Sequence, residues 1–128
     1  MSDPVVAGGA EVVQLRHRSE FLAAARGVRV HRDPFVLQGL PRGEAERAGK
    51  IGLGLTVTKK IGGAVVRNRA RRRLREALRL MLPGPVRPGA DYVVVARPPA
   101  LSLPFARLQR ELEAAFVQIA PRIGQGRR

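Results

Sequence analysis

Residues 51–82 have the sequence IGLGLTVTKKIGGAVVRNRARRRLREALRLML, which contains the pattern of a strand, a glycine break and a long helix. In residues 51–58 apolar residues alternate with glycine and threonine, as expected for a strand that buries one face. The small residues leave the second face without bulk, so either a neighbouring segment packs there or a ligand lies against it. Close packing is the commoner reason. Gly62-Gly63 then interrupts the chain, and the periodicity predicts a helix over 64–82.

The predicted helix is amphipathic. On a helical wheel, one arc of roughly 120° holds its apolar residues, Val66, Ala70, Leu74, Ala77, Leu78 and Met81. The opposite side holds the polar residues Asn68, Arg69, Arg71, Arg72, Arg75 and Arg79, with Arg73 at its edge. Arg67 lies at the border of the apolar arc, where a long side chain can extend its charge to water.

A basic face of this kind is unfavourable for an isolated helix. The arginines at positions 67, 71, 75 and 79 form successive i,i+4 pairs of like charge, each unfavourable by roughly 0.2–0.5 kcal/mol. The first half of the helix also disfavours cations because of the macrodipole. Only Arg72 and Glu76 are spaced as a compensating i,i+4 pair. Bound phosphates would explain why the helix tolerates this repulsion, so the face predicts nucleic-acid binding.

The composition agrees with a polyanionic partner. The chain has 128 residues, enough for one domain, and a formal net charge of +14 from 24 basic and 10 acidic residues. It has no cysteine, which excludes disulfides and thiolate metal sites. It also has no apolar run near the roughly 20 residues of a membrane span and no secretory signal pattern at its N-terminus. We therefore expect a cytoplasmic protein with no membrane partner.

The remaining segments predict one α+β domain, a single-domain α/β sandwich around a central mixed sheet. The predicted order is helix, strands, helix, strand, helix. Its segments are a helix over 19–26 that turns Phe21, Leu22 and Ala25 inward, strands within 28–40 broken at Asp33-Pro34, the strand and helix described above, a strand over 91–96 and a last helix that Ser102 can cap. Pro121 and the Gly/Arg tail are expected to end the domain. The predicted organisation is a flexible arm (1–13), an RNA-binding domain (14–120) and a basic tail (121–128).

Two further features restrict the function. The five aromatic residues are too few for single-strand binding by base stacking alone, which favours recognition of a phosphate backbone and its shape. Neither the two histidines, His17 and His31, nor the paired acids form a cluster suited to a two-metal nuclease. A protein-only nuclease is therefore disfavoured, and the protein itself is expected to hold neither catalytic nor metal-binding residues.

Residues 58–79, TKKIGGAVVRNRARRRLREALR, resemble the signature of the bacterial ribonuclease P protein component. That family has a Lys-Lys-Ile/Val-Gly-x-Ala-Val block, then Arg-Asn-Arg, then a basic helix that contains Arg-Glu. The flanks also agree: Ser19-Glu20-Phe21, Phe35-Val36-Leu37, the GLGLTVTKK strand and DYVVVARPPA. The resemblance covers about residues 13–118.

The resemblance implies the protein subunit of an endoribonuclease that matures the 5′ end of precursor tRNA. In that family a catalytic RNA performs the hydrolysis with Mg²⁺, which RNA phosphates mainly hold. The residues implied to contact the catalytic RNA are Lys59, Lys60, Arg67, Asn68, Arg69, Arg71, Arg72 and Arg75. Those implied to contact the single-stranded leader are Arg16, Phe21 and Phe35, although core packing explains either aromatic equally well.

The resemblance also implies an unusual left-handed βαβ crossover, against the general right-handed preference. The chain departs from many members at Gly63, where they have Asn, and at Ala25 and Gln38, where several have aromatics. These departures put leader stacking in doubt, and they give Arg16, Arg29 or Gln38 a larger part in leader contact.

Three alternatives remain from the residues alone. A ribosomal protein or general RNA chaperone without a catalytic RNA partner would share the charge and the fold class, but would not need the Arg-Asn-Arg block after a Gly-Gly break. A DNA-binding regulator would usually need a dimer surface, and no zipper or second amphipathic face is present, so DNA is not expected. A protein-only nuclease is the third.

Overall fold

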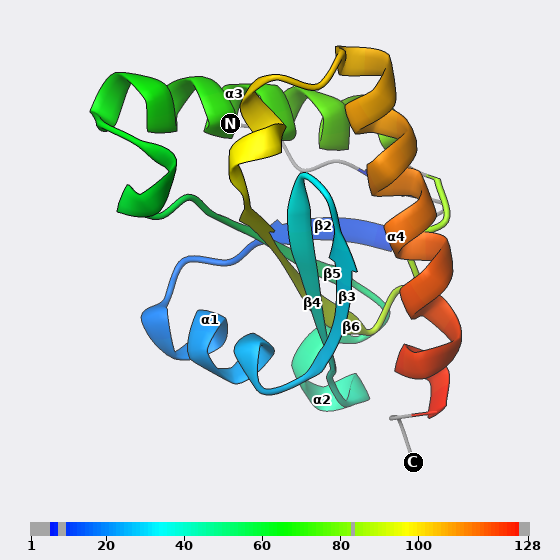
Figure 1. The fold of residues 1–128 in the computed structure, drawn as a ribbon. Coiled ribbons are helices and arrows are strands. Elements are labelled where there is room, and N and C mark those ends of the chain that lie inside the picture. The colour runs from blue at the N-terminus through cyan, green and yellow to red at the C-terminus, as the bar shows by residue number, and fades with distance from the viewer. Residues whose placement is uncertain (1–5, 8–9, 83, 126–128) are drawn as a thin grey trace.

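The chain forms an α+β fold in the computed structural model, which describes residues 6–7, 10–82 and 84–125 (Figure 1). Its strands are β1 (Val6–Ala7), β2 (Ala10–Gln14), β3 (Val28–Arg32), β4 (Phe35–Pro41), β5 (Ile51–Thr56) and β6 (Ala90–Ala96). Its helices are α1 (Arg18–Ala25), α2 (Glu44–Arg47), α3 (Ala64–Met81) and α4 (Phe105–Gln125), with 3-10 helices η1 (Lys59–Ile61) and η2 (Pro98–Leu101). The predicted fold class is confirmed, and the expected loop before β5 contains the short helix α2.

The strands form one mixed sheet in the order β1-β2-β5-β6-β4-β3. β5 runs parallel to both of its neighbours, β2 and β6, whereas the other pairs are antiparallel. Because α3 connects β5 to β6, these three elements form the expected βαβ crossover. The left-handedness of this crossover remains an expectation from the resemblance.

The main core lies between the sheet and the pair of helices α3 and α4 (Figure 1). Alternate residues of the central strands point into it, among them Ile51 and Tyr92. Tyr92 meets Phe116 edge-on with the ring centroids 5.1 Å apart, and its hydroxyl donates to the carbonyl of Arg87 at 2.6 Å. Burial raises the pKa of Tyr92, so the phenol stays a neutral donor. The apolar residues predicted for α3 face this core, as expected.

The opposite face of the sheet carries the eight-residue helix α1. Ala24 of α1 is fully buried there, and Phe21 packs partly buried against Leu15 and Val93. The expectation that Leu22 points inward is wrong, because its side chain is 49% exposed. The apolar anchor of α1 is therefore small.

The glycines of β5 are explained by this second face. A Cβ on Gly54 would lie 2.6 Å from the Phe21 ring, and one on Gly52 would overlap the carboxylate of Asp91. The side chains of α1 and β6 therefore fill the space that the small residues of β5 leave. Close packing, the commoner of the two explanations, holds at both glycines.

The edge strand β3 is protected on its outer side by α4. Arg122 donates to the carbonyl of Arg29 at 3.0 Å, and Arg32 donates to the carboxylate of Glu111 at 2.7 Å. The hydrogen bond from Arg32 lowers the pKa of Glu111, which keeps this buried carboxyl ionised. Because an unpaired strand edge is a template for association, these contacts also protect against aggregation.

Regular secondary structure extends further into both terminal segments than expected. Part of the expected arm 1–13 forms β2, which pairs with β5 from Val12↔Ile51 to Gln14↔Leu53, while residues 1–5 and 8–9 lie outside the described residues. Pro121 does not end the last helix, because α4 continues to Gln125. Ile123 in this last turn is fully buried, and its packing holds the turn in place. Of the expected tail 121–128, residues 126–128 lie outside the described residues.

The contact between the turn that follows α1 and strand β4 gives a prediction about stability. A Cβ on Gly27 would overlap the backbone carbonyl of Gly39, which no side-chain rotation can relieve. We expect Gly27→Ala to lower the free energy of unfolding by about 1–3 kcal/mol or more, measured by urea denaturation. Gly43→Ala is the control, since a Cβ at Gly43 meets nothing within 4 Å. Equal stability of the two variants would contradict this packing.

Candidate nucleic-acid interface

The arginines of α3 form three groups with different contacts. Arg69, Arg72 and Arg75 are exposed and form no hydrogen bond or ion pair with any other described residue. Their charges therefore face water along the side of the helix away from the core. We call these three residues the free arginines. The acidic side chain on this side is Glu76, and its carboxylate is paired with Arg79.

The second group of cations fixes α3 to its surroundings. Arg67 donates to the carbonyl of Gly62 at 3.2 Å, next to the start of the helix. Arg73 donates to the carbonyls of Ala100, at 3.0 Å, and Leu103, which lie in and just after η2. These two arginines therefore satisfy backbone acceptors, and Arg73 ties α3 to the segment that leads into α4.

The remaining polar residues of α3 pair along the helix. Arg71 donates to the side chain of Asn68 at 3.0 Å. The expected pair between Arg72 and Glu76 does not form, because Glu76 accepts from Arg79 at 2.5 Å instead. This hydrogen bond lowers the pKa of Glu76 and raises that of Arg79. The pairing leaves Arg72 available.

The lysines predicted for the interface extend the basic side beyond the helix. Lys59 and Lys60 are exposed in η1, which packs against the start of α3. Val65 is 83% exposed and lies with Val66 in a hollow that is also lined by Arg69, Arg72, Arg73 and Glu76. Val65 is absent from the residues predicted from the sequence. Its position on the arginine side of the helical wheel was the available signal.

A second exposed surface lies on the sheet face that carries α1. Strand pairing places Thr56, Val95, Val36 and His31 side by side across four strands, and all four are at least partly exposed. We call this set the open row. Phe21 lies over Gly54 in the adjacent row, and Arg16 is exposed just before α1.

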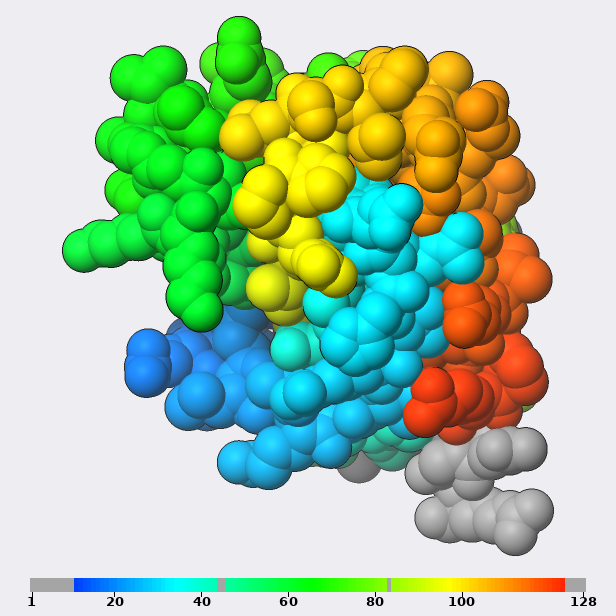
Figure 2. Space-filling model, in the orientation of Figure 1, coloured from blue at the N-terminus to red at the C-terminus, as the bar shows by residue number. Residues whose placement is uncertain are grey.

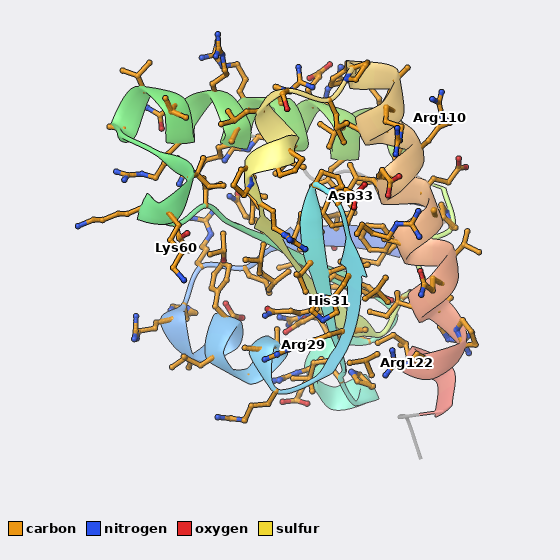
Figure 3. The ribbon with its side chains drawn as sticks, in the orientation of Figure 1. Arg29, His31, Asp33, Lys60, Arg110 and Arg122 are labelled. Carbon is orange, nitrogen blue, oxygen red and sulfur yellow. The ribbon has the colours of Figure 1, made fainter. Side chains whose placement is uncertain are left out.

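Figures 2 and 3 show how the two surfaces are related. In Figure 2 a recess separates the blue residues of α1 from the green residues of η1 and α3. Figure 3 labels Lys60 and His31 on this side of the molecule, whereas Arg110 and Arg122 belong to α4 on the other side. Lys60 of the basic side and His31 of the open row can therefore be seen from the same direction.

The structure contradicts the assignment of Phe35 to this surface. Its side chain is fully buried in the main core, on the face covered by α3 and α4. Strand alternation places its neighbour Val36, and not Phe35, on the α1 side. Of the two expected aromatics, only Phe21 lies near the open row. The open row itself was missed because its members come from four strands whose register is not visible in the sequence.

The described residues offer no evident metal centre. Within residues 6–7, 10–82 and 84–125, no three His, Asp or Glu side chains are grouped so that they could hold a metal ion. A protein-held pair of Mg²⁺ ions needs such carboxylates, so these residues do not fit one. Across the same residues, no helix has the length and apolar character needed to cross a membrane.

Comparison with known proteins identifies similar chains. The family model described as ribonuclease P matches residues 10–120. The chain is 48% identical to the ribonuclease P protein component of Ruegeria pomeroyi, over 80% of this chain and 82% of that protein. It is 41% identical to the one from Brucella suis, over 92% and 87%. The RNase P protein from Thermotoga maritima has a similar structure, with a TM-score of 0.70, 27% identity and coverage of 84% of this chain and 97% of that one.

The first two groups of arginines should differ in their effect on stability. Arg73→Met would leave the carbonyls of Ala100 and Leu103 without this donor, and we expect a loss of about 1.5–3 kcal/mol in the free energy of unfolding. Arg72→Met removes only like-charge repulsion and should change stability by less than about 0.5 kcal/mol, or raise it. Urea denaturation of both variants measures the difference. A larger loss in Arg72→Met would show that the grouping is wrong.

Proposed function

The chain belongs to the ribonuclease P protein family, and we propose that it uses two surfaces for two RNAs. As a member of this family it is the protein subunit of ribonuclease P, an endoribonuclease that acts in the 5′ maturation of transfer RNA. This membership accounts for the basic charge without a ribosomal, chaperone or DNA-regulator role. We further propose the cytoplasm as its compartment.

The first surface is the basic side of α3, which we propose binds the catalytic RNA of the enzyme. The free arginines are the observation that carries this proposal, because like charges along one helix are unfavourable unless phosphates neutralise them. Planar guanidinium groups also form bidentate contacts with phosphate. Lys59, Lys60, Asn68 and Arg71 extend the surface, and Arg67 supports its first turn through Gly62.

The second surface is the open row together with Phe21 and Arg16, which we propose binds the 5′ leader of precursor tRNA. A surface that binds an extended single strand of RNA needs an open path for the strand, an aromatic ring on which a base can stack, and a nearby cation. The open row supplies the path, Phe21 supplies a partly exposed ring, and Arg16 supplies the charge. Arg29 and Gln38 pair beside this path on β3 and β4.

The chemistry itself we assign to the RNA. The described protein residues do not group the carboxylates that would hold catalytic Mg²⁺. RNA phosphates are oxygen ligands of the kind that Mg²⁺ prefers, so the RNA can hold the metal. In this division of labour, the protein places the free arginines against RNA phosphates and holds the leader beside them.

Reconstitution tests the proposal. We expect the isolated protein to leave precursor tRNA intact, and expect a bacterial ribonuclease P RNA plus the protein to remove the leader at low Mg²⁺. The triple variant Arg69→Gln, Arg72→Gln, Arg75→Gln should fold but bind this RNA more weakly. The slope of log K against log salt should fall by roughly 0.7–0.9 for each phosphate that the variant no longer neutralises. Specific cleavage by RNA-free protein, or an unchanged slope, would contradict the proposal.

The leader surface is tested by two phenylalanines on opposite faces of the sheet. Phe21→Leu removes a ring beside the open row and should weaken holoenzyme binding of precursor tRNA by about 1–3 kcal/mol, the value of one stacked base. Binding of mature tRNA, which has no leader, should not change. Phe35→Leu removes a buried ring and should lower stability without altering the ratio of the two affinities. The assignment fails if Phe35→Leu changes this ratio and Phe21→Leu does not.

A further inference from the structure

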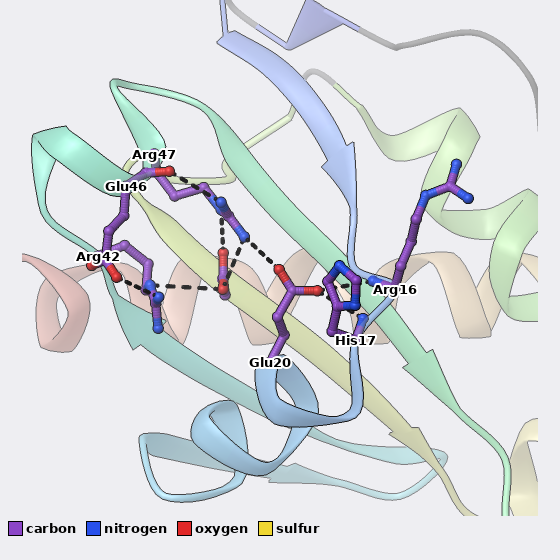
Figure 4. A network of polar contacts seen from close by, with 7 residues as sticks. Arg16, His17, Glu20, Arg42, Glu46 and Arg47 are labelled. Atoms are coloured by element: carbon purple, nitrogen blue, oxygen red, sulfur yellow. Dashed lines mark hydrogen bonds and ion pairs between the residues drawn. The ribbon is translucent and has the colours of Figure 1, made fainter.

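A chain of ion pairs connects the centre of the sheet to the first turn of α1 (Figure 4). Asp91 of β6 has a side chain that is only 1% exposed. Arg47 of α2 donates to both oxygens of Asp91, through Nε at 2.5 Å and Nη2 at 3.2 Å. The Nη2 atom of Arg47 also donates to Oε2 of Glu20 at 3.3 Å. We call Asp91, Arg47 and Glu20 the ion-pair chain.

The Glu20 end of this chain fixes the start of α1. Its second oxygen, Oε1, accepts the backbone N–H groups of Arg16 and His17, each at 2.9 Å. These donors have no partner inside the helix, so Glu20 acts as its N-terminal cap. The hydrogen bond from His17 is the main cause of the lowered pKa of Glu20, which keeps the carboxylate ionised. Arg16 and Phe21, the two α1-side groups proposed to contact the leader, flank this residue.

Stability alone does not explain the ion-pair chain. Removing a carboxylate from water costs several kcal/mol, and apolar residues of similar volume often stabilise a fold as well or better. The strand β5 also leaves out a side chain to make room, because a Cβ on Gly52 would overlap Asp91. Ion pairs with fixed hydrogen-bond geometry do, however, specify position more narrowly than apolar contacts.

Apart from these polar bonds, α1 is anchored to the sheet by few large apolar side chains. Its fully buried apolar side chain is Ala24, and Leu22 is half exposed. Phe21 adds a partly buried contact, and the close approach of Gly27 to Gly39 holds the chain just after the C-terminal end of the helix, so the first turn depends most on its polar contacts. A shift of this turn would move the Phe21 ring relative to the open row.

We propose that Asp91, Arg47 and Glu20 are positioning residues for leader recognition. They hold the first turn of α1 so that Phe21 and Arg16 face the open row together. This inference rests on the proposed leader surface and adds to it the residues that set its geometry. None of the three needs to touch RNA, because they act through Phe21 and the Arg16 backbone.

The link between Arg47 and Glu20 can be broken without leaving a buried charge unpaired. Glu20→Gln keeps one oxygen for the N–H groups of Arg16 and His17, but replaces the acceptor of Arg47 with an amide. Asp91 and Arg47 remain paired with each other. Glu46→Gln is the matched control. Glu46 accepts from Arg42 at 2.6 Å, and Arg42 lies 3.9 Å from Asp91, so this change disturbs the same ion pairs at the end away from the first turn of α1.

The experiment measures binding of precursor and mature tRNA to the holoenzyme reconstituted with a bacterial ribonuclease P RNA. Glu20→Gln should weaken precursor binding about two- to tenfold, the factor that corresponds to one hydrogen bond, with no change for mature tRNA. Glu46→Gln should change neither affinity. In the Phe21→Leu background, Glu20→Gln should have a smaller effect than in the wild-type protein, because the ring that it positions is gone and only Arg16 remains.

Each other outcome overturns the inference in a distinct way. Equal losses for precursor and mature tRNA would make Glu20 merely structural. Normal discrimination in Glu20→Gln, with lost discrimination in Phe21→Leu, would refute the positioning role and leave the leader surface intact. Additive effects of the two changes would show that Glu20 acts independently of Phe21. Normal discrimination in Phe21→Leu would remove the proposed leader surface and this inference with it.

Discussion

The sheet must bury two faces, but the chain provides long helices for only one of them. α3 and α4 cover one face and enclose the main core, whereas the eight residues of α1 cover part of the other. The fold therefore obtains most of its apolar stabilisation on the first face. The second face is free to expose a row of side chains across four strands. This unequal coverage allows a chain of 128 residues to keep a compact core and still present a broad surface.

A similar division applies within α3. One side of this helix belongs to the core, so its charges have to face water or satisfy nearby backbone groups. Arg67 and Arg73 do the latter, which turns two of the like charges into local attachments. The free arginines still repel one another, and binding of a polyanion would relieve this electrostatic repulsion. With the proposed function, the helix thus combines a structural role and a binding role in residues of one type, and the reach of each side chain decides which role it has.

Features that depend on neighbouring residues in the sequence were predictable, whereas features that depend on contacts between distant segments were not. The helix α3 and the strand β5 were predicted well because their patterns are local, and Leu74 or Ile51 faces the core at the position its period requires. Phe35 could not be placed, since its face depends on the register between β4 and β6. β2 was missed because a short segment without a marked pattern becomes a strand only when β5 offers it an edge. The partners of Arg73 are equally invisible in the sequence, because they lie 27 and 30 residues away.

The polar contacts under α1 follow from the unequal coverage. A helix that shares a surface with a ligand cannot be anchored by large apolar side chains without covering that surface. Directional bonds at one end of the helix avoid this conflict, because they hold its first turn while the sheet beside it stays open. The glycines of β5 fit the same requirement, since Gly52 makes room for Asp91 and Gly54 for the Phe21 ring. The sequence left open that Gly52 and Gly54 make space for a ligand. In the structure they make space for the side chains of Asp91 and Phe21.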